Sequence, residues 1–363
     1  MRKILYLLTI LIAQHFLSQE KEKEESPKIN LSGFVEVFYT YDFNEPNYHN
    51  HLRQPFLYTY NRHNEFNLDL AVLKANYQTE NVRANLALQL GTYATDNLNS
   101  EKDVFKFINE ANLGVRLSKK HNIWLDAGIM PTHIGWESVF GKDDATLTRN
   151  IGTENQPFYE TGVKVSYTTQ DGVWQISGSI LNGWQRISRV DGNQTMAFGS
   201  QLSYKPNDKF LFNSSTFIGN DKPEEEKKMR YFHDFFMVYS INEKIQTTFA
   251  FDIGAEQKEK GSKQYNIWYS PNFLLKYQFT PKFSTTGRVE FYSDRNNVLS
   301  TPENKKPFEV FGYSMNFDYK IQPTVLWRLE FRNFHSTKDA IFRKNDDFIK
   351  NNFFITTSIS TWF

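Results

Sequence analysis

The sequence of 363 residues contains no cysteine, which excludes both a disulfide framework and a lipid-anchored N-terminal cysteine. It has no excess of one charge either, because 42 Lys and Arg stand against 41 Asp and Glu. Nucleic acids and anionic membrane surfaces bind clustered positive charge, so neither is an expected partner. After residue 18 the chain lacks the roughly 18-residue apolar run of a transmembrane helix.

The first residues have the pattern of a secretory signal peptide. Arg2 and Lys3 precede an apolar run from Ile4 to Ala13, and a short stretch then ends at Ser18. A run of about ten apolar residues is too short to span a bilayer as a helix, which disfavours the alternative of an N-terminal anchor. We expect residues 1–18 to be a cleaved signal peptide, 19–28 a short periplasmic segment and 29–363 the folded domain.

Aromatic residues are abundant in a chain that is polar on average. There are 33 Phe, 19 Tyr and 7 Trp, while the mean hydropathy is −0.58. A soluble protein would need a large core to bury so many rings. A membrane β-barrel instead spreads them over its outer surface and its two interfacial girdles.

From residue 29 onwards, apolar and polar residues alternate in short segments. The clearest is 82–90, where Val82, Ala84, Leu86, Leu88 and Leu90 fall on one face and Arg83, Asn85, Ala87 and Gln89 on the other. Segments 245–254 and 311–319 alternate in the same way. A period of two predicts strands with one apolar face, as expected where one side meets lipid and the other meets water.

We predict sixteen strands: 29–41, 65–78, 82–93, 107–117, 123–131, 157–168, 173–182, 194–204, 209–218, 230–241, 244–255, 265–279, 282–293, 308–319, 324–333 and 351–363. Two have irregular patterns. The strand at 65–78 changes face near Val72 to Lys74, which suggests a bulge, and both faces of 209–218 are mixed.

The connections between these strands alternate strictly in length. Long ones follow the odd strands, at 42–64, 94–106, 132–156, 183–193, 219–229, 256–264, 294–307 and 334–350, and short turns follow the even strands. Outer-membrane barrels have short periplasmic turns and long external loops. A soluble β-sandwich or propeller also has alternating strands but does not predict this parity. The expected fold is an all-β, antiparallel, up-and-down transmembrane barrel.

The last strand places Ile355, Ile359 and Phe363 on one face. A terminal aromatic residue on such a strand resembles the signal by which the outer-membrane assembly machinery recognises its clients. The alternative is an ordinary interfacial aromatic. The expected partners are therefore this machinery and outer-membrane lipids.

Sixteen strands are enough to leave an aqueous channel, because side chains no longer fill a barrel of that diameter. We therefore expect charged residues on the inward faces to line a pore and to be solvated by its water. The candidates are Arg83, Arg116, Glu160, Arg288, Glu290, Arg328, Glu330 and Arg332. Opposing charges across a pore would sort solutes by charge. Ion pairs that stiffen the wall are the alternative for each residue.

The connection 132–156 is among the longest and is our candidate for an inward-folding constriction. It carries Asp143, Asp144, Arg149 and Glu154, and its stretch GKDDATLTRN has the composition of a helical turn. Loop length is weak evidence of function by itself, so an external loop remains the alternative.

Several motifs resemble the OmpL-like family of outer-membrane β-barrel porins. They are PTHIGWE (Pro131 to Glu137), LTRN (Leu147 to Asn150), PFYETG (Pro157 to Gly162) and LNGWQ (Leu181 to Gln185), with NRHNEFNL near residue 61 and DIG at Asp252. The resemblance covers most of the chain after the signal peptide. It implies a porin-like barrel in the outer membrane of a Gram-negative bacterium and assigns no catalytic residues.

No metal, cofactor or catalytic motif is identifiable. His133, Glu137 and Ser138 lie close in sequence, but such proximity is common by chance and does not define a nucleophile with its base. We expect a non-enzymatic porin that passes small hydrophilic solutes or ions. The alternative is a non-channel barrel that binds partners through its external loops. Many sixteen-stranded porins are trimers, so a homo-oligomer is expected as readily as a monomer.

Overall fold

The computed structural model describes residues 28–46 and 51–363, so the predicted signal peptide and residues 19–27 lie outside the described residues. The barrel strands are β1 (Lys28–Asp42), β2 (Phe66–Gln78), β3 (Val82–Leu90), β4 (Ile108–Arg116), β5 (Asn122–Pro131), β6 (Tyr159–Thr168), β7 (Trp174–Leu181), β8 (Ala197–Asn207), β9 (Phe210–Gly219), β10 (Arg230–Ser240), β11 (Ile245–Gln257), β12 (Tyr265–Thr280), β13 (Phe283–Asp294), β14 (Phe308–Gln322), β15 (Val325–Ser336) and β18 (Asn351–Trp362). The connections hold α2 (Thr92–Asn97), η2 (Asp103–Phe107), η3 (Gly141–Asp143), α3 (Ile151–Glu154) and a small hairpin of β16 (Phe342–Lys344) and β17 (Asp347–Ile349). In the described part of the chain, no helix is long and apolar enough to cross a membrane.

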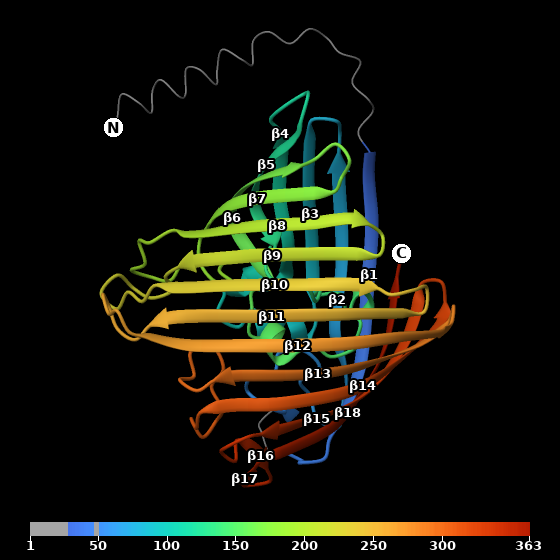
Figure 1. Ribbon diagram of the computed structural model, residues 1–363, viewed down its shortest axis with the longest axis vertical. Helices are drawn as coiled ribbons and strands as arrows, with labels where there is room; N and C mark the ends of the chain where they lie inside the picture. The colour runs from blue at the N-terminus through green and yellow to red at the C-terminus, as the bar shows by residue number, and fades with distance from the viewer. Residues whose placement is uncertain (1–27, 47–50) are drawn as a thin grey trace.

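The sixteen strands form one closed antiparallel barrel, in which each pairs with its neighbours in sequence (Figure 1). The first strand, β1, closes the ring by pairing with β18, in a register that runs from Phe34 opposite Trp362 to Asp42 opposite Phe354. The predicted all-β architecture and strand number are confirmed.

The alternating pattern decides which side chains face outward. On β3, Leu86 and Leu88 are 52% and 51% exposed, whereas Ala87 and Gln89 between them are 0% and 2% exposed. Large apolar side chains on the outer face therefore form the surface that a barrel presents to lipid.

The short turns owe their shape to local hydrogen bonds. At the turn between β10 and β11, the side-chain oxygen of Asn242 accepts hydrogen bonds from the backbone N–H groups of Lys244 and Ile245. In the turn between β6 and β7, Gly172 has a φ of 72°, a conformation that glycine adopts without steric cost. These turns fix the register of the strands that they join.

The predicted irregularity in the second strand is present, but it lies closer to the start of the strand than expected. The pairing of β1 with β2 slips so that Glu36 faces Leu70 and Val37 faces Leu68, which leaves Asp69 as the bulged residue. Asp69 and Leu70 both point inward and are fully buried. The bulge lets the Asp69 carboxylate accept a hydrogen bond from the Tyr60 N–H at 3.1 Å.

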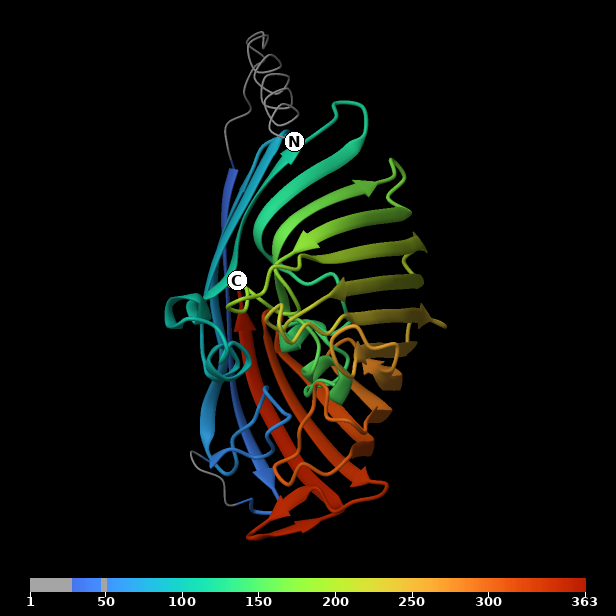
Figure 2. The ribbon, with the colours of Figure 1, turned by 90° about the vertical axis from the view of Figure 1, so that its left-hand side faces the viewer.

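Part of the barrel interior is packed with apolar side chains. One cluster joins Phe56 of the first long connection and Phe342 of the last to the inward residues Phe308, Phe334 and Phe354. Figure 2 shows connecting segments lying between the two walls of the barrel. The external connections therefore contribute a core inside the barrel, and the parity of the linkers does not predict this.

Candidate functional site

A ladder of ion pairs covers the inner wall of β13, β14 and β15. Arg288 Nη2 lies 2.7 Å from Glu330 Oε1, and Arg332 Nη2 lies 2.6 Å from Glu290 Oε1. Beside them, Arg328 Nε donates to Asp318 Oδ1 at 2.7 Å. The spacing of two along each strand places all these side chains on the inward face, as the sequence predicts.

Water does not solvate this ladder, which corrects our expectation. Arg288, Glu290, Arg328, Glu330 and Arg332 are each at most 2% exposed. The physical reason is that the connection 132–156 folds into the barrel and lies directly on them (Figure 2). The wall charges are paired both with one another and with this inward segment.

Charge-assisted hydrogen bonds attach the inward segment 132–156 to the wall. The Thr148 N–H donates to Glu330 Oε2 at 2.6 Å, and the Ile151 N–H donates to Glu290 Oε2 at 2.9 Å. In the other direction, Arg332 Nη1 donates to the Arg149 carbonyl at 2.8 Å. Glu290, Glu330 and Arg332 thus each have at least one side-chain partner and one backbone partner, which compensates their buried charges.

The inward segment also holds its own shape. Arg149 is fully buried and donates to the carbonyl oxygens of Ser138 and Val139, both at 2.7 Å. Glu137 Oε2 accepts hydrogen bonds from the N–H and side-chain amide of Asn150. Residues 137–139 and 149–150 of the segment therefore lie side by side. The expected helical turn within GKDDATLTRN is present at η3.

Asp144 belongs to the same buried network. Its carboxylate accepts a hydrogen bond from the Ser138 N–H at 2.6 Å and lies 3.9 Å from Arg149 Nε. Burial raises the pKa of the Asp144 carboxyl well above its usual range, and the positive charge of Arg149 opposes that rise. Asp144 and Arg149, which we predicted as constriction residues, are buried and stabilise the segment.

Glu154, at the end of the inward segment, ties it to the first long connection. Its carboxylate accepts hydrogen bonds from the N–H groups of Tyr58, at 2.8 Å, and Thr59, at 3.2 Å. The Thr59 hydroxyl donates to the other oxygen. Glu154 is only 2% exposed, so it too acts as a buried clamp.

We expect Glu154→Ala to release the first connection. Hydrogen bonds to a buried charge contribute about 1.5–3 kcal/mol each. Losing them should raise the fraction of molecules in which the first connection is detached about ten-fold or more. Trypsin cleavage after the buried Arg53 is the readout. Glu224→Ala is the control, because Glu224 also accepts bonds from an N–H and a threonine hydroxyl but lies in an exposed loop. Equal cleavage rates in both variants would contradict the clamp.

Two predicted pore-lining arginines lie on other strands, Arg83 on β3 and Arg116 on β4, and keep more exposure. Arg83 Nη2 is 2.5 Å from Asp126 Oδ2, and its side chain is 32% exposed. Arg116 Nη1 is 3.5 Å from Glu80 Oε1, with 22% exposure. These residues are not brought together with the ladder of β13 to β15. The predicted set therefore divides into a buried group and a partly exposed group.

The last two predicted residues, Glu160 and Asp143, lie apart from both groups. Glu160 Oε1 is 2.6 Å from His133 Nδ1, and both side chains are buried. Asp143 pairs with its neighbour Lys142 at 2.6 Å and has a half-exposed side chain. Of the four predicted constriction residues, Asp143 alone is substantially exposed.

His133, Glu137 and Ser138 each have a partner outside the trio. His133 contacts Glu160 through Nδ1 and the Thr216 carbonyl through Nε2 at 2.8 Å. Glu137 binds Asn150, and the Ser138 hydroxyl oxygen accepts from the Phe140 N–H. Their closeness in sequence therefore does not produce a nucleophile with an adjacent base. Among the described residues, no group of three or more His, Asp or Glu is arranged to hold a metal ion.

Three cavities border the inward segment, and one of them, of about 300 Å³, is lined by Lys142 and Asp143 together with Phe34 and Trp362 of the barrel wall. The other two combine several connections. One, of about 410 Å³, is lined by polar and charged residues that include Glu154, Gln156, Arg186, Asp221 and Lys222. The other, of about 270 Å³, is lined by the start of the segment and by the wall of β3 and β4. Sequence reasoning missed all three cavities, because each combines segments that are far apart in the chain.

The closed ring of sixteen antiparallel strands, with an apolar outer face and a charged inner face partly covered by an inward segment, is the architecture of an outer-membrane porin. The model of the family described as "Putative beta-barrel porin-2, OmpL-like" matches residues 28–363, so the chain belongs to this family. The resemblance seen in the sequence motifs is confirmed. The family supports a channel-type role and places the protein in the outer membrane.

Solved structures with the same fold include outer-membrane proteins of several bacteria. The anion-selective porin from Comamonas acidovorans is 9% identical, with a TM-score of 0.60 and coverage of 93% of this chain and 100% of the porin. The outer-membrane channel DcaP of Acinetobacter baumannii is 12% identical, with a TM-score of 0.58 and coverage of 96% and 100%. OmpT of Vibrio cholerae lacking loop L8 is 7% identical, with a TM-score of 0.61 and coverage of 93% and 100%. These identities show the fold alone. No curated protein matches the chain.

Proposed function

We propose that this protein is a porin-like channel through which small hydrophilic solutes or ions diffuse across the outer membrane, without catalysis. The observation that carries the proposal is the inward segment 132–156, which is attached to the wall of a sixteen-stranded barrel by buried charges. A wall of this size encloses more space than its own side chains fill. A rigid segment inside it then sets the width of the passage.

In this proposal the charged residues have two roles. Asp143 is half exposed and Arg83 and Arg116 are partly exposed, so these three are the charged residues that meet a passing solute. The buried charges hold the constriction in place: Asp144, Arg149, Glu154, Glu160, Arg288, Glu290, Arg328, Glu330 and Arg332. Selectivity then depends on the exposed group, because charge close to the path of an ion acts with little screening.

The remaining expectations support the same setting. The apolar outer face favours contact with outer-membrane lipids, and the Arg2 and Lys3 pattern favours export through a cleaved signal peptide. Phe363 is 77% exposed beside Gly33, where an assembly factor can reach it. A homo-oligomer is part of the proposal, and OmpT of Vibrio cholerae, which shares the fold, has a trimer form.

Planar-bilayer recording tests the proposal. Folded protein, verified by its heat-dependent mobility on a gel, should insert and give stepwise increases in current. Asp143→Asn should shift the reversal potential in a salt gradient towards lower cation preference, because it removes an exposed negative charge. A folded barrel that inserts but conducts at no voltage would exclude the channel and favour a barrel that binds partners through its loops.

A further inference from the structure

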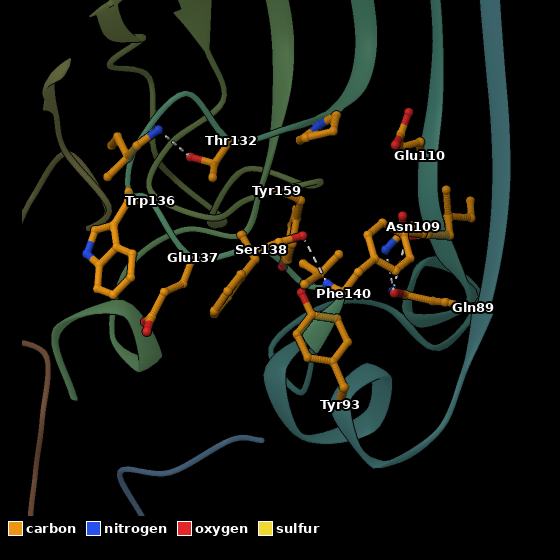
Figure 3. A pocket seen from close by; sticks show the side chains of 16 residues that line it. Gln89, Tyr93, Asn109, Glu110, Thr132, Trp136, Glu137, Ser138, Phe140 and Tyr159 are labelled. Atoms are coloured by element: carbon orange, nitrogen blue, oxygen red, sulfur yellow. Dashed lines mark hydrogen bonds between the residues drawn. The ribbon is translucent and has the colours of Figure 1, made fainter. Parts of the chain in front are cut away.

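The cavity of about 270 Å³ lies between the start of the inward segment and the opposite wall (Figure 3). Thr132, Trp136 and Ser138 line it from the segment, whereas Gln89 and Glu110 line it from β3 and β4. Figure 3 shows Trp136 on one side of this space and Gln89, Asn109 and Glu110 on the other. Aromatic and polar side chains both line the cavity: Tyr93 lies near Gln89, and Glu137 and Ser138 lie on the side of Trp136.

Aromatic rings form much of the cavity wall. Tyr93 and Phe158 meet edge to face with their centroids 5.7 Å apart, and Trp136, Phe140 and Tyr159 complete the lining. Tyr93 and Phe158 are fixed because the buried Arg149 lies within 6.0 Å of both rings. The rings are therefore held in place before any solute arrives, which lowers the cost of binding.

One edge of the cavity is polar. Asn109 donates to the side-chain oxygen of Gln89 at 3.0 Å, and Gln89 donates to the backbone of the neighbouring strand. The Glu110 carboxylate is held by Lys74, whose Nζ lies 2.7 Å from Oε1. A carboxylate offers several acceptor sites, so Glu110 can still accept a hydrogen bond through Oε2. This edge of the cavity thus favours a solute that donates a hydrogen bond.

The rings of Tyr93, Phe158 and Tyr159 belong to an apolar cluster inside the barrel, and the cavity is the place where this cluster borders open space. Small-molecule sites are typically concave and lined by aromatic and apolar side chains with a few polar groups, as this cavity is. A dry apolar cavity of about 150 Å³ is enough to bind benzene, so 270 Å³ accommodates a substituted ring. Ring walls prefer edge-to-face or offset contacts with another ring.

We propose that this cavity is a binding subsite for a planar aromatic solute that carries a hydrogen-bond donor on its ring. The ring lies among Tyr93, Phe158 and Trp136, and the donor faces Glu110. Since it names a class of solute, the inference rests on the proposed channel function. Binding itself is measurable whether or not the barrel conducts.

Isothermal titration of the folded barrel in detergent tests the subsite with three probes. p-Cresol has both ring and donor, anisole has the ring without the donor, and cyclohexanol has the donor without a planar ring. We expect saturable binding of p-cresol, with anisole and cyclohexanol each weaker by about ten-fold. Equal heats from all three probes, or heats that never saturate, would mean partition into detergent and would overturn the subsite.

Two variants locate the binding. Val139→Trp fills the cavity and should abolish p-cresol binding, whereas Val163→Trp adds the same ring on the outer face and should leave it unchanged. Glu110→Gln should lower the affinity for p-cresol by about ten-fold and leave the affinity for anisole unchanged. The control Glu80→Gln also removes a carboxylate paired with a cation and should change neither affinity. Binding that survives both cavity variants would overturn the assignment. Conductance without p-cresol binding would reject the subsite alone, and binding without conductance would reject the channel alone.

Discussion

Replacing Val139–Thr148 with two glycines is expected to raise the single-channel conductance several-fold. The excised residues lie inside the barrel, and conductance grows with the open cross-section. The cut ends can be rejoined because Arg149 donates to the Ser138 carbonyl and Asn150 donates to Glu137. The measurement is the step size in a planar bilayer at fixed salt and voltage.

A matched control shortens the exposed connection between β11 and β12 by removing Glu259–Lys263. This loop lies at the rim of the barrel, and Lys258 N–H bonds to the Gln264 carbonyl across its base, so the chain can be rejoined there. The control should conduct like the parent protein. If the inner deletion folds and gives the parent step size, the inward segment is not the constriction.

The second large effect is expected from Arg332→Ala. This guanidinium donates to Glu290 at 2.6 Å and also to the Thr148 hydroxyl and the Arg149 carbonyl, both at 2.8 Å. Breaking a buried ion pair by removing one partner costs about 3–5 kcal/mol, because an uncompensated charge remains. We therefore expect a lower unfolding midpoint and larger current fluctuations, as the segment loses its attachment.

A double variant separates the ion pair from the packing. Arg332→Met with Glu290→Gln removes both charges and keeps an oxygen that can accept from the Ile151 N–H. Its unfolding midpoint should lie well above that of Arg332→Ala and close to that of the parent protein, because buried pairs that are replaced together often lose little or no stability. The midpoint is read from the heat-dependent gel shift. An Arg332→Ala barrel as stable as the parent would show that the ladder contributes little.

The strands could be predicted because the signal for each is local. A period of two on Val82–Leu90 is sufficient to assign Leu86 outward and Gln89 inward, whatever the rest of the chain does. The bulge lies at Asp69 and not near Val72 to Lys74 as predicted. Its position depends on a hydrogen bond to Tyr60, which lies in a connection where no alternating pattern indicates its contacts. The hairpin of β16 and β17 was missed because strands of three residues carry too little pattern.

The candidate site could be predicted only in part, and the missing part is non-local. The inward faces of Arg288 and Glu330 follow from alternation, but their burial depends on Thr148, which is 182 residues before Glu330 in the chain. Linker length suggested that 132–156 was special without indicating its path. The motif LTRN (Leu147 to Asn150) carried one signal for this path: it places Arg149 in a long loop, and a buried arginine needs partners for its charge.

The hydrogen bonds between the first and last strands make the order of strands cyclic. Gly33 and Phe363 exchange two backbone hydrogen bonds of 3.1 Å, so the ring has no structural beginning. A circularly permuted chain, opened at the turn between β8 and β9, would preserve every strand pair while moving the terminal aromatic residue into the interior of the sequence. The permuted chain would therefore separate the stability of the ring from the proposed recognition of Phe363.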